Sequence, residues 1–200
     1  MKPFRISILG LYCILLGMLL TGCHQPTPNP TAIGSDTNRQ TTDTMWKQEF
    51  EQLLPKLGHR NWILVVDQAY PLQSAQGILT IDTEQPLPAV LKELVNMLNQ
   101  APHVKPIYYT DLELQALSDE ICPGAEQAQL DIFNKLNGAQ VNTILHEEVF
   151  AKIDAASKLF TTVVLKTQSR IPYSSVFIEL DCGYWTSDAE EALRAKMKTM

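Results

Sequence analysis

The sequence predicts one α/β domain with a largely parallel sheet flanked by helices. Short runs of bulky and β-branched residues, such as Trp62 to Val66, are typical of buried strands. They alternate with longer segments, such as Leu87 to Leu98, in which apolar residues recur at helical spacing. Strands that alternate with helices form parallel sheets. The 200 residues, 45% of them hydrophobic, allow one core of ordinary size, and a second domain is not expected.

The individual elements follow from local signals along the chain. Apolar residues recur at helical spacing from Met45, and Pro55 should bend or end this helix. The next predicted elements are the strands Trp62 to Val66 and Ile78 to Asp82, the helix Leu87 to Leu98, the strand Val104 to Thr110, helical pieces between Asp111 and Asn137 interrupted at Cys122-Pro123-Gly124, the strand Val141 to Leu145, a helix opening at His146, and the strand Tyr173 to Cys182. Ser187 and Glu190 are spaced as a capping box for a final helix within residues 187–200.

The first residues are predicted to be a targeting segment. Lys2 and Arg5 form a short basic region, and Ile6 to Leu20 is an apolar run too short to span a bilayer comfortably. The run ends in Leu20-Thr21-Gly22-Cys23, which looks like a bacterial lipoprotein signal over residues 1–22 with Cys23 as the lipid-carrying residue. An ordinary secretory signal with an incidental cysteine is the alternative. Either way the domain would be exported, and lipidation would anchor it to a bacterial membrane at the periplasmic face or cell surface.

Residues 23–44 are predicted to form a flexible tether. Pro, Thr, Asn, Gln and Ser dominate this segment, so it has too little apolar surface to offset the entropy lost on ordering. The folded domain is expected to occupy residues 45–200.

The net charge of −6 and the pI near 5.2 argue against a nucleic-acid partner. In an exported domain, Cys122 and Cys182 are permitted to form a disulfide, but two separate buried thiols are equally consistent with the sequence.

Three polar residues stand at predicted strand ends. His59 precedes the strand Trp62 to Val66 and Asp67 follows it, so these two lie at opposite rims and need not share a site. His146 follows the strand Val141 to Leu145. Sites in α/β sheets usually lie at the carboxyl ends of strands, where both Asp67 and His146 stand. Purely structural roles as turn or helix caps remain an alternative for His59 and Asp67.

Two segments resemble one known family. The stretch LGHRNWILVVDQAYP, from Leu57 to Pro71, is similar to the opening motif of the D-ribose pyranase and L-fucose mutarotase family, and VVLKTQSRIPYSSVFIELDCGYW resembles the closing segment. The resemblance implies His59 as the general acid and Asp67 as the residue that holds sugar hydroxyls or orients the histidine. It also implies substrate contacts from four further positions, namely His146, Tyr173, Ser174 and Ser175.

The chain departs from the family pattern at the closing segment. Ser175 replaces an asparagine, Ser174 an alanine, and Gln168 a glycine at a position suited to positive φ. A serine hydroxyl reaches less far than an amide, so sugar preference is expected to differ. The family also places a helix over Lys158 to Lys166, where β propensity is high. Because Phe150, Ile153, Ser157, Phe160 and Val164 fit one helical face, we expect that helix here.

The resemblance implies an isomerase that interconverts anomers or ring forms of a free pentose or deoxyhexose. This reaction needs proton transfer at the ring oxygen and the anomeric hydroxyl, with no cofactor and no metal. Ring-shaped homo-oligomers with sites completed by a neighbour are also implied. A non-catalytic sugar-binding lipoprotein is the alternative. A metal site built from His59, His146, Asp67 and Glu147 is a third hypothesis, although no metal-ligand spacing such as His-x-x-x-His occurs.

The lipoprotein hypothesis predicts that Cys23→Ser releases the domain from the membrane fraction into the soluble exported fraction, because the variant lacks the thiol that would carry the lipid. Fractionation of cells that express the two forms tests this. Unchanged membrane association of the variant would contradict lipid attachment at Cys23.

Overall fold

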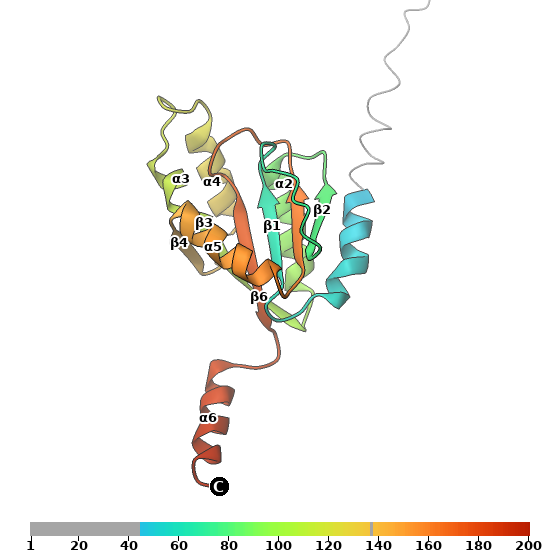
Figure 1. Ribbon diagram of the computed structural model, residues 1–200. Helices are drawn as coiled ribbons and strands as arrows, with labels where there is room; N and C mark the ends of the chain where they lie inside the picture. Colours follow the sequence, from blue (N-terminus) through green and yellow to red (C-terminus); the bar gives the residue numbers. More distant parts are fainter. Residues whose placement is uncertain (1–44, 137) are drawn as a thin grey trace, which may run out of the picture. The chain divides into compact units, whose positions relative to one another are not determined.

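The computed structural model describes residues 45–136 and 138–200, and they form a single α/β domain around a six-stranded sheet (Figure 1). The strand order is β2-β5-β1-β6-β3-β4. The strands are β1 (Trp62–Val66), β2 (Ile78–Asp82), β3 (Val104–Asp111), β4 (Val141–Ile144), β5 (Thr162–Lys166) and β6 (Val176–Cys182). Strand β6 runs antiparallel to its neighbours β1 and β3, and the other pairings are parallel. The predicted fold class is confirmed.

Helices cover both faces of the sheet. The helices are α2 (Leu87–Asn99), α3 (Leu112–Ala116), α4 (Ala125–Lys135) and α5 (His146–Ser157), followed by α6 (Ser187–Met197), which has no buried residue and lies away from the sheet (Figure 1). The chain is also helical over residues 45–53, and this helix passes into the 3-10 turn η1 (Leu54–Lys56) at Pro55, as expected. Among the described residues, no helix is both long and apolar enough to cross a membrane.

Strand β1 lies inside the sheet and is buried along its whole length. Ile63 and Val65 pack on one side with the leucines of α2, with Trp46 and with Ile132 of α4. Trp62, Leu64 and Val66 pack on the other side with α5. Successive side chains of a strand point to opposite faces, so a strand covered on both faces needs the continuous apolar run that the sequence shows.

The expected helix over Lys158 to Lys166 is wrong. Helix α5 ends at Ser157, and β5 runs from Thr162 to Lys166 between β1 and β2. The side chains from Thr162 to Leu165 are all buried. The apparent helical face continued the stripe of α5 past its end, whereas burial on both sides selects the β-branched residues Thr162, Val163 and Val164.

Two further boundaries differ from prediction. Strand β6 begins at Val176, and Tyr173 lies in the loop before it. The expected capping box of Ser187 and Glu190 is wrong, because Thr186 is the N-cap of α6 and its hydroxyl accepts a hydrogen bond from the Ala189 N–H at 3.2 Å.

Cys122 and Cys182 are both half-buried free thiols. The predicted signal, lipid-carrying cysteine and tether lie outside the described residues.

The position of β5 yields a stability prediction. Leu165 is fully buried and Leu159 is 80% exposed, so Leu165→Ala should lower the free energy of unfolding by about 2–5 kcal/mol. Leu159→Ala, the matched control from the same segment, should change it by less than about 0.5 kcal/mol. Chemical denaturation of both variants measures the difference. Equal small effects would contradict a buried strand at this position.

Candidate functional site

The candidate site lies at the carboxyl ends of the parallel strands. Asp67 follows β1 directly, Asp111 is the last residue of β3, and His146, which follows β4, is the first residue of α5. The loop between β5 and β6 contributes Tyr173. An open cavity of about 520 Å³ is lined by Asp67, Gln68, Ala69, His146, Arg170, Ile171, Pro172 and Tyr173. Its volume lies within the range of about 300–1,000 Å³ that is common for small-molecule sites.

A buried carboxyl group orients His146. Asp111 is fully buried, and its Oδ2 lies 2.9 Å from Nδ1 of His146. Burial raises the pKa of Asp111 to about 6, although the hydrogen bond and charge of His146 oppose the rise. The negative charges of Glu113 and Asp67 raise this pKa further. Since Nδ1 is engaged by Asp111, Nε2 is the ring nitrogen left for a ligand.

The backbone of His146 is also held in place. Its N–H donates to both carboxylate oxygens of Glu113, at 3.0 and 3.2 Å, so an acidic side chain from α3 caps the first turn of α5. A negative charge at a helix N-terminus is favourable because the helix dipole and the unpaired N–H groups point towards it. The imidazole packs against Phe150 at 4.6 Å and stands edge-on to Tyr173 at 5.2 Å between ring centroids. The ring is therefore fixed from several directions.

Tyr173 occupies an unusual backbone conformation. Its φ is +59°, a left-handed value that L-residues other than glycine rarely adopt. Such strain persists only where the surroundings enforce it and is often found at functional sites. Gln168, where the family has glycine, does not have positive φ, and its N–H donates to the carbonyl of Gln85 at 2.9 Å. The loop therefore needs no glycine at residue 168.

The loops after β1 and β5 are joined by hydrogen bonds. The Thr167 hydroxyl donates to the carbonyl of Val66 at 2.7 Å, and the Gln68 N–H donates to the carbonyl of Ser169 at 2.8 Å. Nε of Arg170 donates to Oε1 of Gln68 at 2.9 Å. The Asp67 carboxylate itself accepts the Ala69 N–H at 2.7 Å. These bonds position Asp67 relative to the loop that holds Tyr173.

His59 lies at the opposite end of β1. Its Nδ1 is 2.9 Å from Oδ1 of Asp181, and its Nε2 accepts from Nε of Arg60 at 3.2 Å. The five residues of β1 alone span about 13 Å, so within one chain His59 does not reach the cavity of His146. Of the sequence-predicted residues, the structure therefore brings together Asp67, His146 and Tyr173.

Ser174 and Ser175 are buried and do not line the cavity. The Ser174 hydroxyl donates to the carbonyl of Ile171 at 2.7 Å and contacts the Ser169 hydroxyl at 3.1 Å, so it shapes the loop that holds Tyr173. Tyr70, three residues after Asp67, is buried and packs on Phe150. Tyr184 and Trp185 line a different cavity beside His59.

Sequence reasoning missed Asp111, Glu113 and Arg170. Asp111 could have been found by the rule that selected Asp67, because it is a carboxyl residue at the end of a predicted strand. Glu113 and Arg170 act through contacts between segments distant in sequence, which no local pattern reports. Among the described residues, no group of three or more His, Cys, Asp or Glu side chains is arranged to hold a metal ion.

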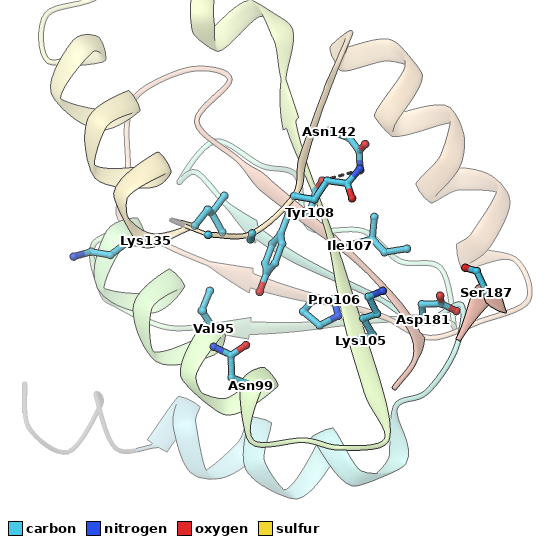
Figure 2. A pocket seen from close by; sticks show the side chains of 14 residues that line it. Val95, Asn99, Lys105, Pro106, Ile107, Tyr108, Lys135, Asn142, Asp181 and Ser187 are labelled. Carbon is cyan, nitrogen blue, oxygen red and sulfur yellow. Dashed lines mark hydrogen bonds between the residues drawn. The ribbon is translucent and has the colours of Figure 1, made fainter. Parts of the chain in front are cut away.

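A second cavity, of about 620 Å³, lies beside β3 and is shown in Figure 2. Strand β4 pairs with β3 only from Tyr108 to Asp111, so the edge of β3 before Tyr108 is left open on that side. Lys105 and Pro106 stand along this edge, where a charge and a missing N–H discourage pairing with another strand. No histidine occurs among the described residues that line this cavity. We place the candidate site at His146 because the buried Asp111 carboxyl orients its ring there.

Comparisons with known proteins identify no matching family model and no matching curated protein. Among solved structures, the chain is similar to RbsD of Bacillus subtilis complexed with D-ribose, with 18% identity, 69% of this chain and 93% of that chain covered, and a TM-score of 0.47. It is also similar to FucU of Bifidobacterium longum, with 11% identity, coverage of 67% and 94%, and a TM-score of 0.43. For the fucose mutarotase of Streptococcus pneumoniae in complex with L-fucose the identity is 14%, the coverage 66% and 91%, and the TM-score 0.44. Function is therefore argued from the site itself.

The raised pKa of Asp111 predicts a pH dependence of stability. The pKa of Asp111 is about 6 in the folded protein, compared with an ordinary value of 3.8, so between these pH values the folded state binds more protons than the unfolded state. The contribution of Asp111 to stability therefore falls as the pH rises from about 4 to about 6. The unfolding free energy of the wild type minus that of Asp111→Asn should therefore fall by about 1–3 kcal/mol between pH 4 and pH 7. Denaturation at several pH values measures it. A flat difference would contradict the raised pKa.

Proposed function

We propose that the chain is a monosaccharide mutarotase or pyranase, which interconverts anomers or ring forms of a free sugar by acid-base ring opening. The observation that carries the proposal is the buried Asp111 carboxyl paired with His146 at a cavity that Asp67 and Tyr173 also line. A carboxylate that binds Nδ1 of a histidine fixes the tautomer and leaves Nε2 to exchange protons. The sugar class expected from the resemblance of the motifs is a pentose or a deoxyhexose.

Ring opening moves two protons and breaks one bond. An acid protonates the ring oxygen, a base removes the proton of the anomeric hydroxyl, the bond between the anomeric carbon and the ring oxygen breaks, and an aldehyde forms that recloses on either face. Nε2 of His146 is placed to serve as one of these two groups. The Asp67 carboxylate accepts a sugar hydroxyl or serves as the second group. Tyr173 supplies a ring surface beside the imidazole for the apolar face of a sugar.

The role that the resemblance implies for His59 requires a second copy of the chain. His59 lies at the amino end of β1 and the His146 cavity at the carboxyl end, so a His59 that acts in this cavity would have to come from a neighbouring chain. We propose a ring-shaped homo-oligomer in which adjoining chains share each site. Head-to-tail contacts between unlike surfaces close into rings when their rotation closes. We further propose that Cys23 anchors these rings to the bacterial membrane on its exported side.

Non-catalytic sugar binding is the second candidate function. One observation favours it: both ring nitrogens of His59 are engaged within the chain, by Asp181 and by Arg60. A histidine held in this way is not free to protonate a sugar unless Arg60 moves. In this case the cavity would retain a sugar through Asp67 and His146 without accelerating ring opening.

Exchange of anomers distinguishes the two functions. Saturation-transfer NMR with a panel of pentoses and deoxyhexoses should show the protein accelerating exchange for at least one sugar. His146→Ala should lower the exchange rate on the order of 100- to 10,000-fold with sugar binding largely retained, as removal of a positioned acid or base typically does. His103→Ala is the matched control, because His103 bonds the Leu54 carbonyl away from the cavity. Binding without any acceleration by the wild type would establish the binding protein instead.

Shared sites are tested by mixing chains. If His59 comes from a neighbour, both His59→Ala and His146→Ala should be inactive as pure proteins. Co-expression of the two in equal amounts should restore about a quarter of the wild-type exchange rate, since random assembly leaves that share of the sites with both histidines. Wild-type exchange in pure His59→Ala, with about half of that rate in the equal mixture, would limit the site to one chain.

A further inference from the structure

The C-terminal helix α6 stands outside the core of the domain. None of its residues from Ser187 to Met197 is buried. Its apolar side chains nevertheless recur at helical spacing, with Ala189, Leu193 and Met197 four residues apart. Leu193 is 41% exposed and Met197 is 54% exposed. An apolar stripe that the described residues of its own chain leave unburied is expected to have a partner.

The charges of α6 are divided along its length. Its first half contains Asp188, Glu190 and Glu191, and its last turn contains Arg194 and Lys196, followed by Lys198. The basic residues lie beside Met197 and Met200, so apolar and cationic groups share the same end of the helix. The whole chain has a net charge of −6, which makes this basic end a local exception. Long basic side chains can cover apolar surface while their charged ends reach towards an anionic layer.

Two exposed aromatic residues precede the helix. Tyr184 is 79% exposed and Trp185 is 46% exposed. The indole N–H of Trp185 donates to Glu190 at 2.9 Å, and Glu190 also accepts from Arg194 at 2.7 Å. These bonds fix Trp185 to the helix as one unit. Tyrosine and tryptophan favour the boundary between water and lipid, because each combines an apolar ring with a polar group.

We infer that α6 is a membrane-surface helix that lies against a bilayer containing anionic lipid. Leu193, Met197 and Trp185 would enter the headgroup layer, while the basic end would face lipid phosphates. Each basic residue near an anionic surface favours contact by roughly fivefold, so the contact is weak and reversible by itself. A second copy of the chain is the competing partner for the apolar stripe, but it would not account for the basic end of an otherwise acidic chain.

The place where α6 leaves the domain gives the contact a function. It follows β6, whose end lies beside His59 at the amino ends of the parallel strands, and the His146 cavity opens at their carboxyl ends. Gly183, where the chain leaves β6, packs so closely on Pro102 and Val104 that an added Cβ would lie 2.4 Å from the Pro102 carbonyl oxygen. A helix held on the bilayer here would direct the cavity away from the lipid. The tether predicted for residues 23–44 would by itself give no such orientation.

Fluorescence of Trp185 tests the inference in the full-length chain. Trp46 and Trp62 are buried, so lipid-borne quenchers should act chiefly on Trp185. In vesicles of brominated phosphatidylglycerol, Trp185 emission should be lost, and this loss should be much smaller with brominated phosphatidylcholine or high salt. Trp185→Phe supplies the baseline. The quenching should disappear in the double variant Leu193→Glu with Met197→Glu.

The matched control is Leu72→Glu with Leu159→Glu, since each of these leucines is 80% exposed elsewhere on the domain. This control should leave the quenching unchanged. Because α6 has no buried residue, thermal unfolding of the α6 variant should match the wild type, which separates lost contact from lost folding. Trp185 that remains unquenched in the anionic vesicles would overturn the inference. The inference would also be overturned if the double variant Leu193→Glu with Met197→Glu were quenched normally but sedimented as a smaller assembly than the wild type. In that case the stripe would join two copies of the chain.

Discussion

Burial of β1 on both faces is the constraint on which the rest of the domain depends. Covering one face requires α2 with the helix over residues 45–53, and covering the other requires α5. A strand in this position pairs on both edges, which draws β5 to one side and β6 to the other. Because β5 runs parallel to β1, the loops after both strands emerge at the same edge of the sheet. Asp67 and Tyr173 are neighbours for this reason.

The electrostatics of the site follow from the same packing. Asp111 ends β3 beneath the first turn of α5, where it has no exposure to water. One of its oxygens is bound by His146, and the other, Oδ1, has no hydrogen-bond partner in the described structure. Burial of a partly unsatisfied carboxyl group costs stability, and its raised pKa expresses that cost. A fold that retains such a group gains an oriented imidazole at the cavity, which is a functional property rather than a stabilising one.

Much of the fold could be predicted from local pattern, and the failures have physical causes. The run from Trp62 to Val66 and the stripe of α2 are unambiguous because each has one period and clear ends. The segment Lys158 to Lys166 resembles a helix because its apolar residues extend the stripe of α5, and the family resemblance favours the same prediction. Its burial between two strands is a tertiary property that overrides the helical spacing. The partners of His146 were equally hidden, since Asp111 is 35 positions away in sequence.

The separation of His59 from His146 is the most informative result for mechanism. Both histidines are paired with an aspartate through Nδ1 at 2.9 Å, but their surroundings differ. Asp111 is fully buried, whereas the Asp181 side chain is 42% exposed and the His59 side chain 55% exposed. An exposed pair exchanges its hydrogen bond with water at little cost, while a buried one is expensive to break. The His146 pair is therefore preorganised in the single chain, and the His59 pair acquires a comparable environment only if another surface covers it.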